Sequence, residues 1–425
     1  MSRRRFAYPF LSVLFVLFLS TSAFGAGFAL YEGSARGNVL GAGMTAVADD
    51  ASAVFYNPAG ITQLKGMQGM VGATFIYPKT DVYTTPGGET ATSENWWIPP
   101  HAYLTYQMSD KWWAGFGMFS RFGLGTEFPQ EWPGRYNSYY ARIRSVELNP
   151  NIAYKVNEKF SVAAGLNATW FELKLENRIS PTTFGAPAVL GDANSSMKGD
   201  GWGWGFNLAM QYKPAEDWYL GASYRSRISI RLDQGDADFT KPAAWAAIGP
   251  ANAVLLRDTK ASGGLHLPDE VFAGIAWRVI PTVTLGGGII WTKWSTYDKL
   301  QITYDLPIAP GVGTVVKQKQ YKDVYRFTVG GEWKFMPNWR ASLGYAYDQE
   351  PSQDQYADYL IPANDRNMFS AGLGFDYGKW TADFSYTLIL INQRTIPARP
   401  ADGVLASEFK NGNASLFGIS LGYKF

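Results

Sequence analysis

Segments in which apolar and polar residues alternate recur from Met67 to the C-terminus, and the connections between them are short and long by turns. A period of two indicates β-strands whose two faces meet different surroundings. We expect about fourteen strands, at residues 67–85, 96–108, 111–122, 138–156, 158–178, 199–213, 217–234, 264–280, 282–304, 319–336, 338–348, 366–377, 379–391 and 414–425.

The short and long connections alternate along the chain, so in an antiparallel sheet the short ones lie at one end of the strands and the long ones at the other. Short turns on one side and long loops on the other are typical of a transmembrane antiparallel β-barrel, whereas a soluble sandwich does not need that regular switch. The sequence therefore predicts an all-β fold, a transmembrane antiparallel barrel of about 14 strands. The short connections are residues 109–110, 156–158, 214–217, 280–282, 336–338 and 377–379, and the long ones are 179–198, 235–263, 305–318, 349–365 and 392–413.

The faces of the predicted strands differ as lipid and lumen require. An arginine on the lipid face at mid-membrane costs about 2–4 kcal/mol. Arg225, Arg227 and Arg231 are therefore expected to face the lumen or to lie near the rim. In the last strand the lipid face is expected to carry Phe417, Ile419, Leu421, Tyr423 and Phe425.

Residues 1–25 have the three parts of a secretory signal peptide: a basic start, an apolar run from Phe10 to Leu19, and a small-residue site that ends at Gly25. We expect cleavage after Gly25. Beyond it, no stretch approaches the roughly 20 apolar residues that a membrane-spanning helix requires. Export together with a predicted barrel indicates the bacterial outer membrane.

Composition argues against several classes of site. The chain has no cysteine, which removes disulfides, thiol nucleophiles and thiolate metal sites. Its two histidines leave little material for a histidine metal cluster, and a formal net charge of +2 gives no reason to expect nucleic acid as a partner. We expect no cofactor, no metal site and no catalytic residue.

The segment before the first strand, residues 26–66, is rich in Gly, Ala and Ser and shows no strand alternation. Its small side chains allow the backbone to pack in a confined space. Asp49 or Asp50 can cap a short helix over residues 51–55. Asn57-Pro58 then ends this helix, because proline disfavours helical geometry in the residue before it. An ordinary helix and turn of a globular domain fits the local sequence equally well.

Several short motifs follow one another along the chain: Ala26-Gly-Phe-Ala-Leu-Tyr-Glu32, Ala48-Asp-Asp50, Asn57-Pro-Ala59, Phe122-Gly-Leu-Gly-Thr-Glu-Phe128, Tyr224-Arg-Ser226, Leu267-Pro-Asp-Glu270, Trp294-Ser295, Lys322-Asp-Val-Tyr-Arg326 and Asn338-Trp339. Through them the chain resembles the FadL/TodX family of outer-membrane transporters for long-chain fatty acids and other hydrophobic compounds. The resemblance covers essentially the whole mature chain. It implies a fourteen-stranded barrel, residues 67–425, whose lumen is plugged by an N-terminal hatch, residues 26–66.

The resemblance also implies a path for the ligand. A hydrophobic ligand first meets an apolar groove between two extracellular loops and then enters a lumenal pocket where basic side chains meet its carboxylate. Arg178 and Lys322 match these basic residues, Lys322 through the longer motif. A solvated charge at a strand end is the alternative for each.

One long connection is unusually apolar for an extracellular loop. Residues 239–256 include Trp245 and Leu255, and an exposed apolar patch commonly marks a binding surface. With residues 184–190 of the preceding long loop, this segment is expected to form the capture groove. Packing of the loop on itself over the barrel mouth is the alternative.

A hatch that fills the lumen blocks straight passage, so the ligand must displace it or leave sideways through the wall. Opening a wall requires a kink or bulge, for which glycine is the usual device, and the third strand carries several glycines that include Gly123. The resemblance implies a lateral window near residues 119–125, gated by the N-terminal peptide, with Phe28 as an apolar plug. The residues expected to line the window are Asn57, Pro58 and Ala59.

The expected partners follow from the fold. The last strand ends in Phe425, and this aromatic end resembles the signal by which the barrel assembly machinery recognises outer-membrane barrels. Outer-membrane lipid and lipopolysaccharide would surround the wall. A closed barrel has no free edge strand, so we expect a monomer.

Alternative functions remain open from the sequence. The cargo can be an aromatic hydrocarbon or a terpenoid in place of a fatty acid. A general porin would have an open polar lumen, whereas residues 26–66 precede the first strand here. A barrel lipid hydrolase needs a histidine in an acid–base role, and neither His101 nor His266 lies near a recognisable nucleophile motif.

Overall fold

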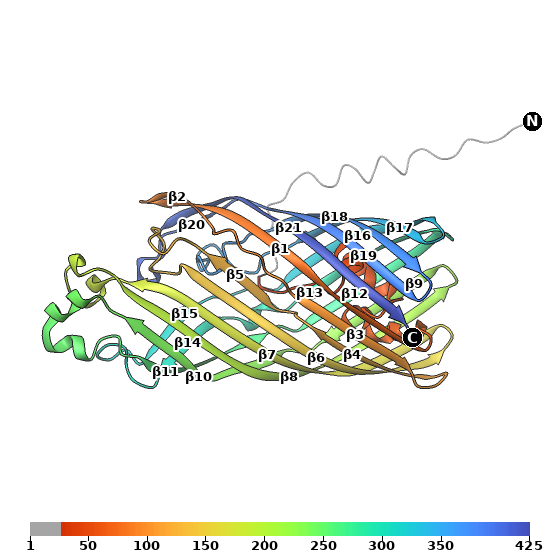
Figure 1. Ribbon diagram of the computed structural model, residues 1–425, viewed down its shortest axis with the longest axis horizontal. Helices are drawn as coiled ribbons and strands as arrows, with labels where there is room; N and C mark the ends of the chain where they lie inside the picture. The colour runs from red at the N-terminus through yellow and green to blue at the C-terminus, as the bar shows by residue number, and fades with distance from the viewer. Residues whose placement is uncertain (1–26) are drawn as a thin grey trace, which may run out of the picture.

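The computed structural model describes residues 27–425, which form a closed antiparallel β-barrel (Figure 1). The barrel closes where the first strand, β1 (Met67–Thr85), pairs with the last, β21 (Ala406–Lys424), and the two lie side by side as orange and blue ribbons in Figure 1. Within residues 27–425, none of the helices has the length and apolar character needed to span a membrane. The predicted signal peptide lies outside the described residues.

The wall contains fourteen strands, five of which are built from two pieces. After β1, the order is β3 (Pro100–Gln107), β4 (Trp112–Phe119) with β5 (Gly123–Glu127), β6 (Tyr140–Asn157), β7 (Phe160–Ile179), β8 (Ala193–Ala215), β9 (Trp218–Arg225) with β10 (Ile228–Thr240), β11 (Thr259–Leu267) with β12 (Glu270–Ile280), β13 (Val283–Thr292) with β14 (Lys299–Tyr304), β15 (Thr314–Gln318) with β16 (Val324–Met336), β17 (Trp339–Asp348), β18 (Arg366–Tyr377), β19 (Trp380–Ile391) and β21. Two short strands, β2 (Gly88–Ala91) and β20 (Arg394–Ile396), extend the ladders of β1 and β21 beyond the barrel.

The predicted all-β barrel of fourteen strands is confirmed, and the bounds of β1 and β18 agree with the predicted ranges. The predicted loop bounds were wrong in four places. The stretch 179–198 contains the start of β8, and 305–318 contains β15. The stretch 235–263 contains the end of β10 and the start of β11, and 392–413 contains β20 and the start of β21. Antiparallel hydrogen bonding continues beyond the apolar part of these strands, so alternation of apolar residues marks only part of each ladder.

The two faces of the wall differ as expected. Ile419 and Leu421 in the last strand are exposed on the outer surface, while Ser420 between them is buried and accepts a hydrogen bond from the Ala35 N–H at 2.9 Å. Arg225 faces the lumen and is fully buried. Arg231, on the second piece of the same strand, is exposed on the outer side.

The N-terminal segment (residues 27–66) lies inside the barrel, toward the end with short turns, where it is the red coil in Figure 1. Its helices contact strands on every side of the lumen, and nearly all of its residues are buried. Glycines in the wall permit this fit: a Cβ at Gly344 would lie 1.9 Å from the Val39 carbonyl oxygen, and one at Gly221 would lie 1.8 Å from that of Thr45. The helices are α1 (Ala35–Leu40), η1 (Gly41–Gly43), α2 (Met44–Val47), α3 (Ala53–Tyr56) and η2 (Pro58–Gln63).

The turn into α3 uses the predicted residues. The Asp50 carboxylate accepts from the Ser52 N–H at 2.8 Å, and the helix begins one residue later. It ends at Tyr56, directly before Asn57-Pro58, as the proline rule predicts. The Asn57 side chain then accepts from the Ala59 N–H at 3.1 Å, which starts η2.

The long connections carry short 3-10 helices at the other end of the barrel. Two of these connections meet in an apolar cluster around Trp245 and Leu256. The remaining helices are η3 (Pro181–Phe184), η4 (Ala188–Leu190), η5 (Ala243–Ala253), η6 (Trp294–Thr296) and η7 (Pro400–Asp402).

Candidate functional site

The barrel wall is interrupted between its second and third strands. The β3–β4 ladder ends with the pair His101 and Phe119. Beyond that pair, β5 is hydrogen-bonded to β6, while the facing residues 92–99 are held to β1 through the bridge of Trp97 with Ile76. The two sides meet again at Glu127, whose carbonyl accepts from the Ser93 N–H at 2.7 Å and whose carboxylate accepts from the Asn95 side-chain amide at 2.7 Å. We call the stretch between these two closures the wall window.

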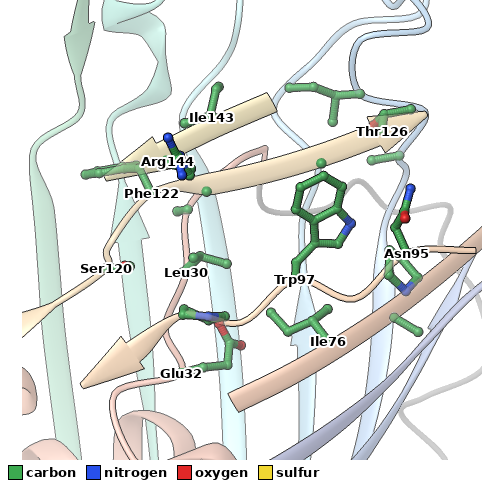
Figure 2. A pocket seen from close by; sticks show the side chains of 18 of the residues that line it. Leu30, Glu32, Ile76, Asn95, Trp97, Ser120, Phe122, Thr126, Ile143 and Arg144 are labelled. Atoms are coloured by element: carbon green, nitrogen blue, oxygen red, sulfur yellow. The ribbon is translucent and has the colours of Figure 1, made fainter. Parts of the chain in front are cut away.

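A cavity of about 390 Å³ opens at the wall window. This volume lies in the range of ligand sites, roughly 300–1,000 Å³. Figure 2 shows Trp97 between Ile76 and the strand that carries Phe122 and Thr126. Most of the lining is apolar, and it includes Leu30, Ile76, Trp97, Ile98, Phe122, Ile143, Ile389 and Leu416.

The cavity reaches both faces of the wall. Leu416 and Ile389 belong to a buried cluster of the interior. Arg144 and Trp170 also line the cavity, although they alternate with the interior residues Ile143 and Phe171 and therefore point outward. A path with an apolar lining thus connects the lumen with the outer surface through the window.

Glycines of β5 leave room for two side chains that line the window, Trp97 and Leu30. A Cβ at Gly125 would lie 1.8 Å from Cε2 of Trp97, which is closer than any carbon contact allows. A Cβ at Gly123 would lie 2.8 Å from Cδ1 of Leu30. The indole of Trp97 and the side chain of Leu30 therefore occupy space that only glycine leaves open.

The N-terminal peptide supplies the backbone partner that the broken strand lacks. The Leu30 N–H donates to the Arg121 carbonyl at 2.7 Å, and the Gly123 N–H donates to the Phe28 carbonyl at 3.0 Å. Residues 28–30 thereby form a bridge with residues 121–123, centred on Ala29 and Phe122. Movement of this peptide would expose the break.

Phe28 is buried among aromatic rings, and its role as an apolar plug stays a prediction. Its ring centroid lies 4.5 Å from that of Trp294, 5.6 Å from that of Tyr297 and 6.0 Å from that of Phe122. Edge-to-face aromatic pairs of this kind are worth about 0.5–1.5 kcal/mol each beyond burial. The peptide is therefore held by side chains as well as by backbone hydrogen bonds.

A buried ionic network lies directly behind the break. Arg121 binds Glu147 at 3.0 Å and also binds Glu270. Arg225 binds the other oxygen of Glu147 at 3.0 Å and donates to the carbonyls of Val54 (3.0 Å) and Phe55 (2.9 Å). One carboxylate, Glu147, therefore links the broken strand to the C-terminal end of α3 in the N-terminal segment.

Charged groups also flank the cavity on the lumen side. Glu32 and Arg366 both line it. Arg366 donates to Asp348 at 2.7 Å, and Arg326 lies 3.8 Å from both Asp348 and Glu32. Arg366 is a cation in the cavity that the sequence reasoning missed.

Lys322 lies in the connection between β15 and β16 and is half-buried. Its N–H donates to the Pro351 carbonyl at 3.0 Å. Burial lowers the pKa of Lys322, and burial raises the pKa of the neighbouring Asp365 to about 7 even though Lys322 acts to lower it. Lys322 does not line the cavity itself, and its role in ligand binding stays a prediction.

Arg178 occupies the end of β7, near the long loops. Its guanidinium donates to Glu131 at 2.9 Å and to Gln130 at 3.0 Å, and it lies over the ring of Tyr139. The structure does not bring Arg178 to the cavity. Its predicted ligand-binding role remains untested.

The apolar loop residues are buried in the cluster between the two long connections. Trp245 is fully buried, and its indole N–H donates to the Gly191 carbonyl at 2.9 Å. Phe184 lies 5.9 Å from it, ring to ring, so the two loops predicted to form a groove are in contact. Leu255 is also buried. This arrangement agrees with self-packing over the barrel mouth, and capture of ligand there stays a prediction.

Asn57, Pro58 and Ala59 lie in the N-terminal segment, away from the wall window. The Asn57 amide donates to the Thr45 carbonyl at 2.7 Å and to the Gln211 side chain at 2.6 Å on β8. None of the three lines the cavity. Asn57 thereby ties the segment to the wall, and the gating role of the three residues stays a prediction.

The two histidines lie in separate hydrogen bonds. His101 Nε2 pairs with Ser420 Oγ at 2.9 Å in the interior, and His266 Nδ1 pairs with Ser229 Oγ at 2.9 Å on an exposed face. In the part of the chain that the structure describes, no cluster of three or more His, Asp or Glu side chains could hold a metal ion.

The sequence reasoning did not identify Leu30, Trp97 or Arg144, which line the window. The run Trp96-Trp97-Ile98-Pro99-Pro100 contained a signal for one side of it, because two successive prolines cannot donate to a strand ladder. Arg144 had no such signal, since its place at the window depends on pairing with β5.

Comparisons with known proteins agree with the fold. The chain is 27% identical to a long-chain fatty acid transport protein of Escherichia coli O6:H1 over 96% of this chain and 97% of that protein. The structure resembles a FadL homologue of Pseudomonas aeruginosa with a TM-score of 0.79 and 19% identity, covering 95% of this chain and 100% of that one.

It also resembles the toluene transporter TodX of Pseudomonas putida, with a TM-score of 0.69 and 15% identity over 88% of this chain and 94% of that one. The family model for outer membrane protein transport proteins (OMPP1/FadL/TodX) matches residues 16–425. The match and the barrel together place the protein in the outer membrane. The chain therefore belongs to the OMPP1/FadL/TodX family of outer-membrane transport proteins.

Proposed function

We propose that this protein takes up long-chain fatty acids or similar hydrophobic compounds, capturing them at the long loops, binding them in the lumen and releasing them sideways through the wall window. The observation that carries the proposal is the cavity that reaches both faces of the wall, at a break whose backbone is held by the N-terminal peptide. Relatives that carry fatty acids or toluene support the class of cargo.

The lining of the cavity suits an apolar chain with an optional acidic end. Each buried methylene contributes about 0.8 kcal/mol, so an acyl chain supplies most of the affinity. A charge-assisted hydrogen bond adds about 1.5–3 kcal/mol, and Arg366 and Lys322 are the cations on the lumen side that can orient a carboxylate. An aromatic hydrocarbon would use the apolar lining alone.

Gating follows from the contacts of residues 28–30. When this peptide detaches from residues 121–123, the cavity loses its inner wall at Leu30 and its aromatic plug at Phe28. Cargo in the lumen can then pass Gly123 and Gly125 into the membrane. Conformational gating by a short peptide is a common way to couple ligand arrival to release.

A reversible crosslink tests the proposal. The chain has no cysteine, and Ala29 and Phe122 form an antiparallel bridge whose spacing suits a disulfide. In the A29C/F122C variant, oxidation should abolish uptake of fatty acid into cells while surface binding persists, and reduction should restore uptake. The F122C single variant is the matched control. Equal uptake in the oxidised and reduced double variant would refute gating by this peptide.

A general porin remains the second candidate class, and its test is conductance. The N-terminal segment contacts strands on every side of the lumen, so we expect no large steady conductance in planar bilayers. The monomeric state and recognition by the barrel assembly machinery stay predictions. Chemical crosslinking in native membranes that captured a stable trimer would contradict the first.

A further inference from the structure

The outer faces of β6, β7 and β8 change from apolar to charged side chains at one level. Cross-strand partners share a face of the sheet, so each row of partners can be followed across the three strands. One row consists of Val146, Trp170 and Trp202, and the next row toward the long loops consists of Arg144, Glu172 and Asp200.

Three cations converge on one carboxylate in the charged region. Glu172 lies 2.7 Å from Arg144, 2.9 Å from Arg142 and 3.4 Å from Lys198. The side chain of Glu172 is only 4% exposed, whereas those of Arg144 and Lys198 are 52% and 51% exposed. We call Arg142, Arg144 and Lys198 around Glu172 the basic patch. The outer surface of the basic patch is therefore formed by the guanidinium and ammonium groups of these side chains, and the Glu172 carboxylate lies buried behind them.

Cations lie next to one another in and beside the basic patch. Arg142, Lys174 and Lys198 lie directly opposite one another on three adjacent strands, and like charges in such positions are destabilising. The other acids nearby have partners of their own: Glu176 pairs with Lys174 at 2.6 Å, and Asp200 accepts the indole N–H of Trp170 at 3.1 Å. Asp236, opposite Lys198 on β10, pairs with Lys260 at 2.5 Å.

The surroundings identify the kind of anion. Below the basic patch lie exposed aromatic rings, with Trp202 51% and Trp204 71% exposed. Aromatic rings of this kind mark the boundary between hydrocarbon and water, and the long-loop end of an outer-membrane barrel faces outward. The patch therefore lies at the level of the lipid head groups in the outer leaflet.

We propose that the basic patch binds the phosphate groups of a glycolipid of the outer leaflet, with the acyl chains of that lipid against Trp170, Trp202 and Trp204. Guanidinium groups bind phosphate in a bidentate manner, and Lys198 adds a point charge. Arg144 and Trp170 also line the cavity at the wall window. The bound lipid would thus lie beside the opening, and the inference does not depend on the proposed transport.

Native mass spectrometry of the purified full-length protein tests this site, with lipid A that carries two phosphates as the probe. Wild-type protein should retain this lipid, and the R142Q/R144Q/K198Q variant should bind it on the order of 100-fold more weakly, since each basic residue near a membrane surface contributes about 1 kcal/mol. The matched control is K155Q/K159Q/K213Q, which removes three lysines at the short-turn end of the same strands. It should bind like wild type.

Two further measurements test whether the site recognises phosphate on a lipid or free inorganic phosphate. Lipid A without phosphates should bind wild type and the triple variant equally weakly, and inorganic phosphate at millimolar concentration should not displace the phosphorylated lipid. Equal retention of phosphorylated lipid A by wild type and the triple variant would overturn the proposal, as would displacement by inorganic phosphate. If the triple variant does not fold, R144Q alone should weaken binding several-fold, and wild-type affinity in R144Q would refute the site.

Discussion

Two gaps in the barrel wall look alike in the strand ladder and differ in what lies behind them. At the wall window, β5 and residues 92–99 are not paired with each other between the His101–Phe119 pair and the Ser93–Glu127 hydrogen bond. The second gap lies between β8 and β10, where pairing stops above Asn207 and resumes at Lys198. The first gap leads into an apolar cavity that crosses the wall, and the second leads into an open outer groove of about 500 Å³.

The β8–β10 gap is sealed by the wall itself. A Cβ at Gly201 would lie 1.9 Å from the Arg231 carbonyl oxygen, and one at Gly203 would lie 2.5 Å from Cγ2 of Ile228. The backbone of β10 therefore lies over the glycine face of β8, inside the wall line. Its outward side chains, Ser229 and Arg231 among them, give the groove a polar floor.

The difference teaches that missing strand pairing alone does not make a passage. A gap backed by a covalently continuous strand stays closed, whereas a gap backed by a peptide that can detach can open. The two gaps are nevertheless connected, because Glu147 binds both Arg121 at the window and Arg225 at the end of β9. Two predictions test this comparison and two further ones test the basic and acidic residues Lys322 and Asp365, beginning with the one of largest expected effect.

Replacing Arg121 by methionine should weaken the contact between the N-terminal segment and the wall at the window, and this is the largest effect we expect. The substitution leaves Glu270 without its ion-pair partner, and breaking a buried ion pair costs about 3–5 kcal/mol. We expect a clear drop in thermal stability in detergent and faster proteolysis of the N-terminal segment. The matched variant is R225M, which should release α3 from the wall but leave Glu147 paired with Arg121. An R121M protein as stable as wild type would show that the network does not hold the break.

Bulky substitutions at the two gaps should have opposite consequences for transport. Gly125→Leu collides with Trp97 inside the window and should reduce uptake to near background, while the protein remains folded by circular dichroism. Gly203→Leu collides with Ile228 at the sealed gap and should lower stability, because overpacking costs about 1–3 kcal/mol. Uptake per folded molecule should be unchanged in Gly203→Leu. The comparison fails if both variants lose uptake equally.

The contrast between the gaps also shows how far sequence reasoning reaches. Period-two alternation and loop lengths predicted the fourteen-stranded barrel, because both are local properties of the chain. The glycines of the third strand marked the break for the same reason. Trp97 and Leu30 were missed as window residues, since their positions depend on contacts between distant segments.

The alternation of inward and outward residues along a strand could have told which face of the wall Arg178 occupies, and the sequence reasoning did not use it. Phe171 and Leu175 belong to the interior cluster, so Arg178, at an odd offset from both, falls on the outer-face register of β7. Lys322 lies where β15 and β16 are interrupted, and alternation gives no face there. The sequence could therefore have argued against a lumenal Arg178, but it could not place Lys322.

Lys322→Glu should weaken the binding of acidic ligands and leave the binding of neutral ligands unchanged. Losing a charge-assisted contact of about 1.5–3 kcal/mol weakens carboxylate binding roughly tenfold or more, and neutral hydrocarbons should bind as before. Binding of a fatty acid and of its methyl ester, measured by calorimetry, gives the comparison directly. The control is Arg178→Glu, near the long loops, where Arg178 donates to Glu131; this variant should leave both affinities unchanged. Equal losses for the acid and the ester in Lys322→Glu would assign Lys322 a structural role only.

The smallest expected effect is a pH dependence of carboxylate binding that originates at Asp365. Burial raises the pKa of this carboxyl to about 7, and its neighbours Lys322 and Arg394 act in the opposite direction. Because the folded state holds the proton up to a higher pH than the unfolded state, stability should fall as pH rises from about 4 to about 7. Below pH 7, the neutral Asp365 leaves the charge of Lys322 less compensated, so a fatty-acid carboxylate should bind somewhat more tightly at pH 6 than at pH 8. Asp365→Asn should remove the pH dependence of stability and the pH dependence of carboxylate binding. The asparagine keeps an acceptor for the Glu350 N–H, which donates to Asp365 at 3.2 Å in the wild type. Persistence of the pH 6 to pH 8 difference in Asp365→Asn would place the titrating group elsewhere.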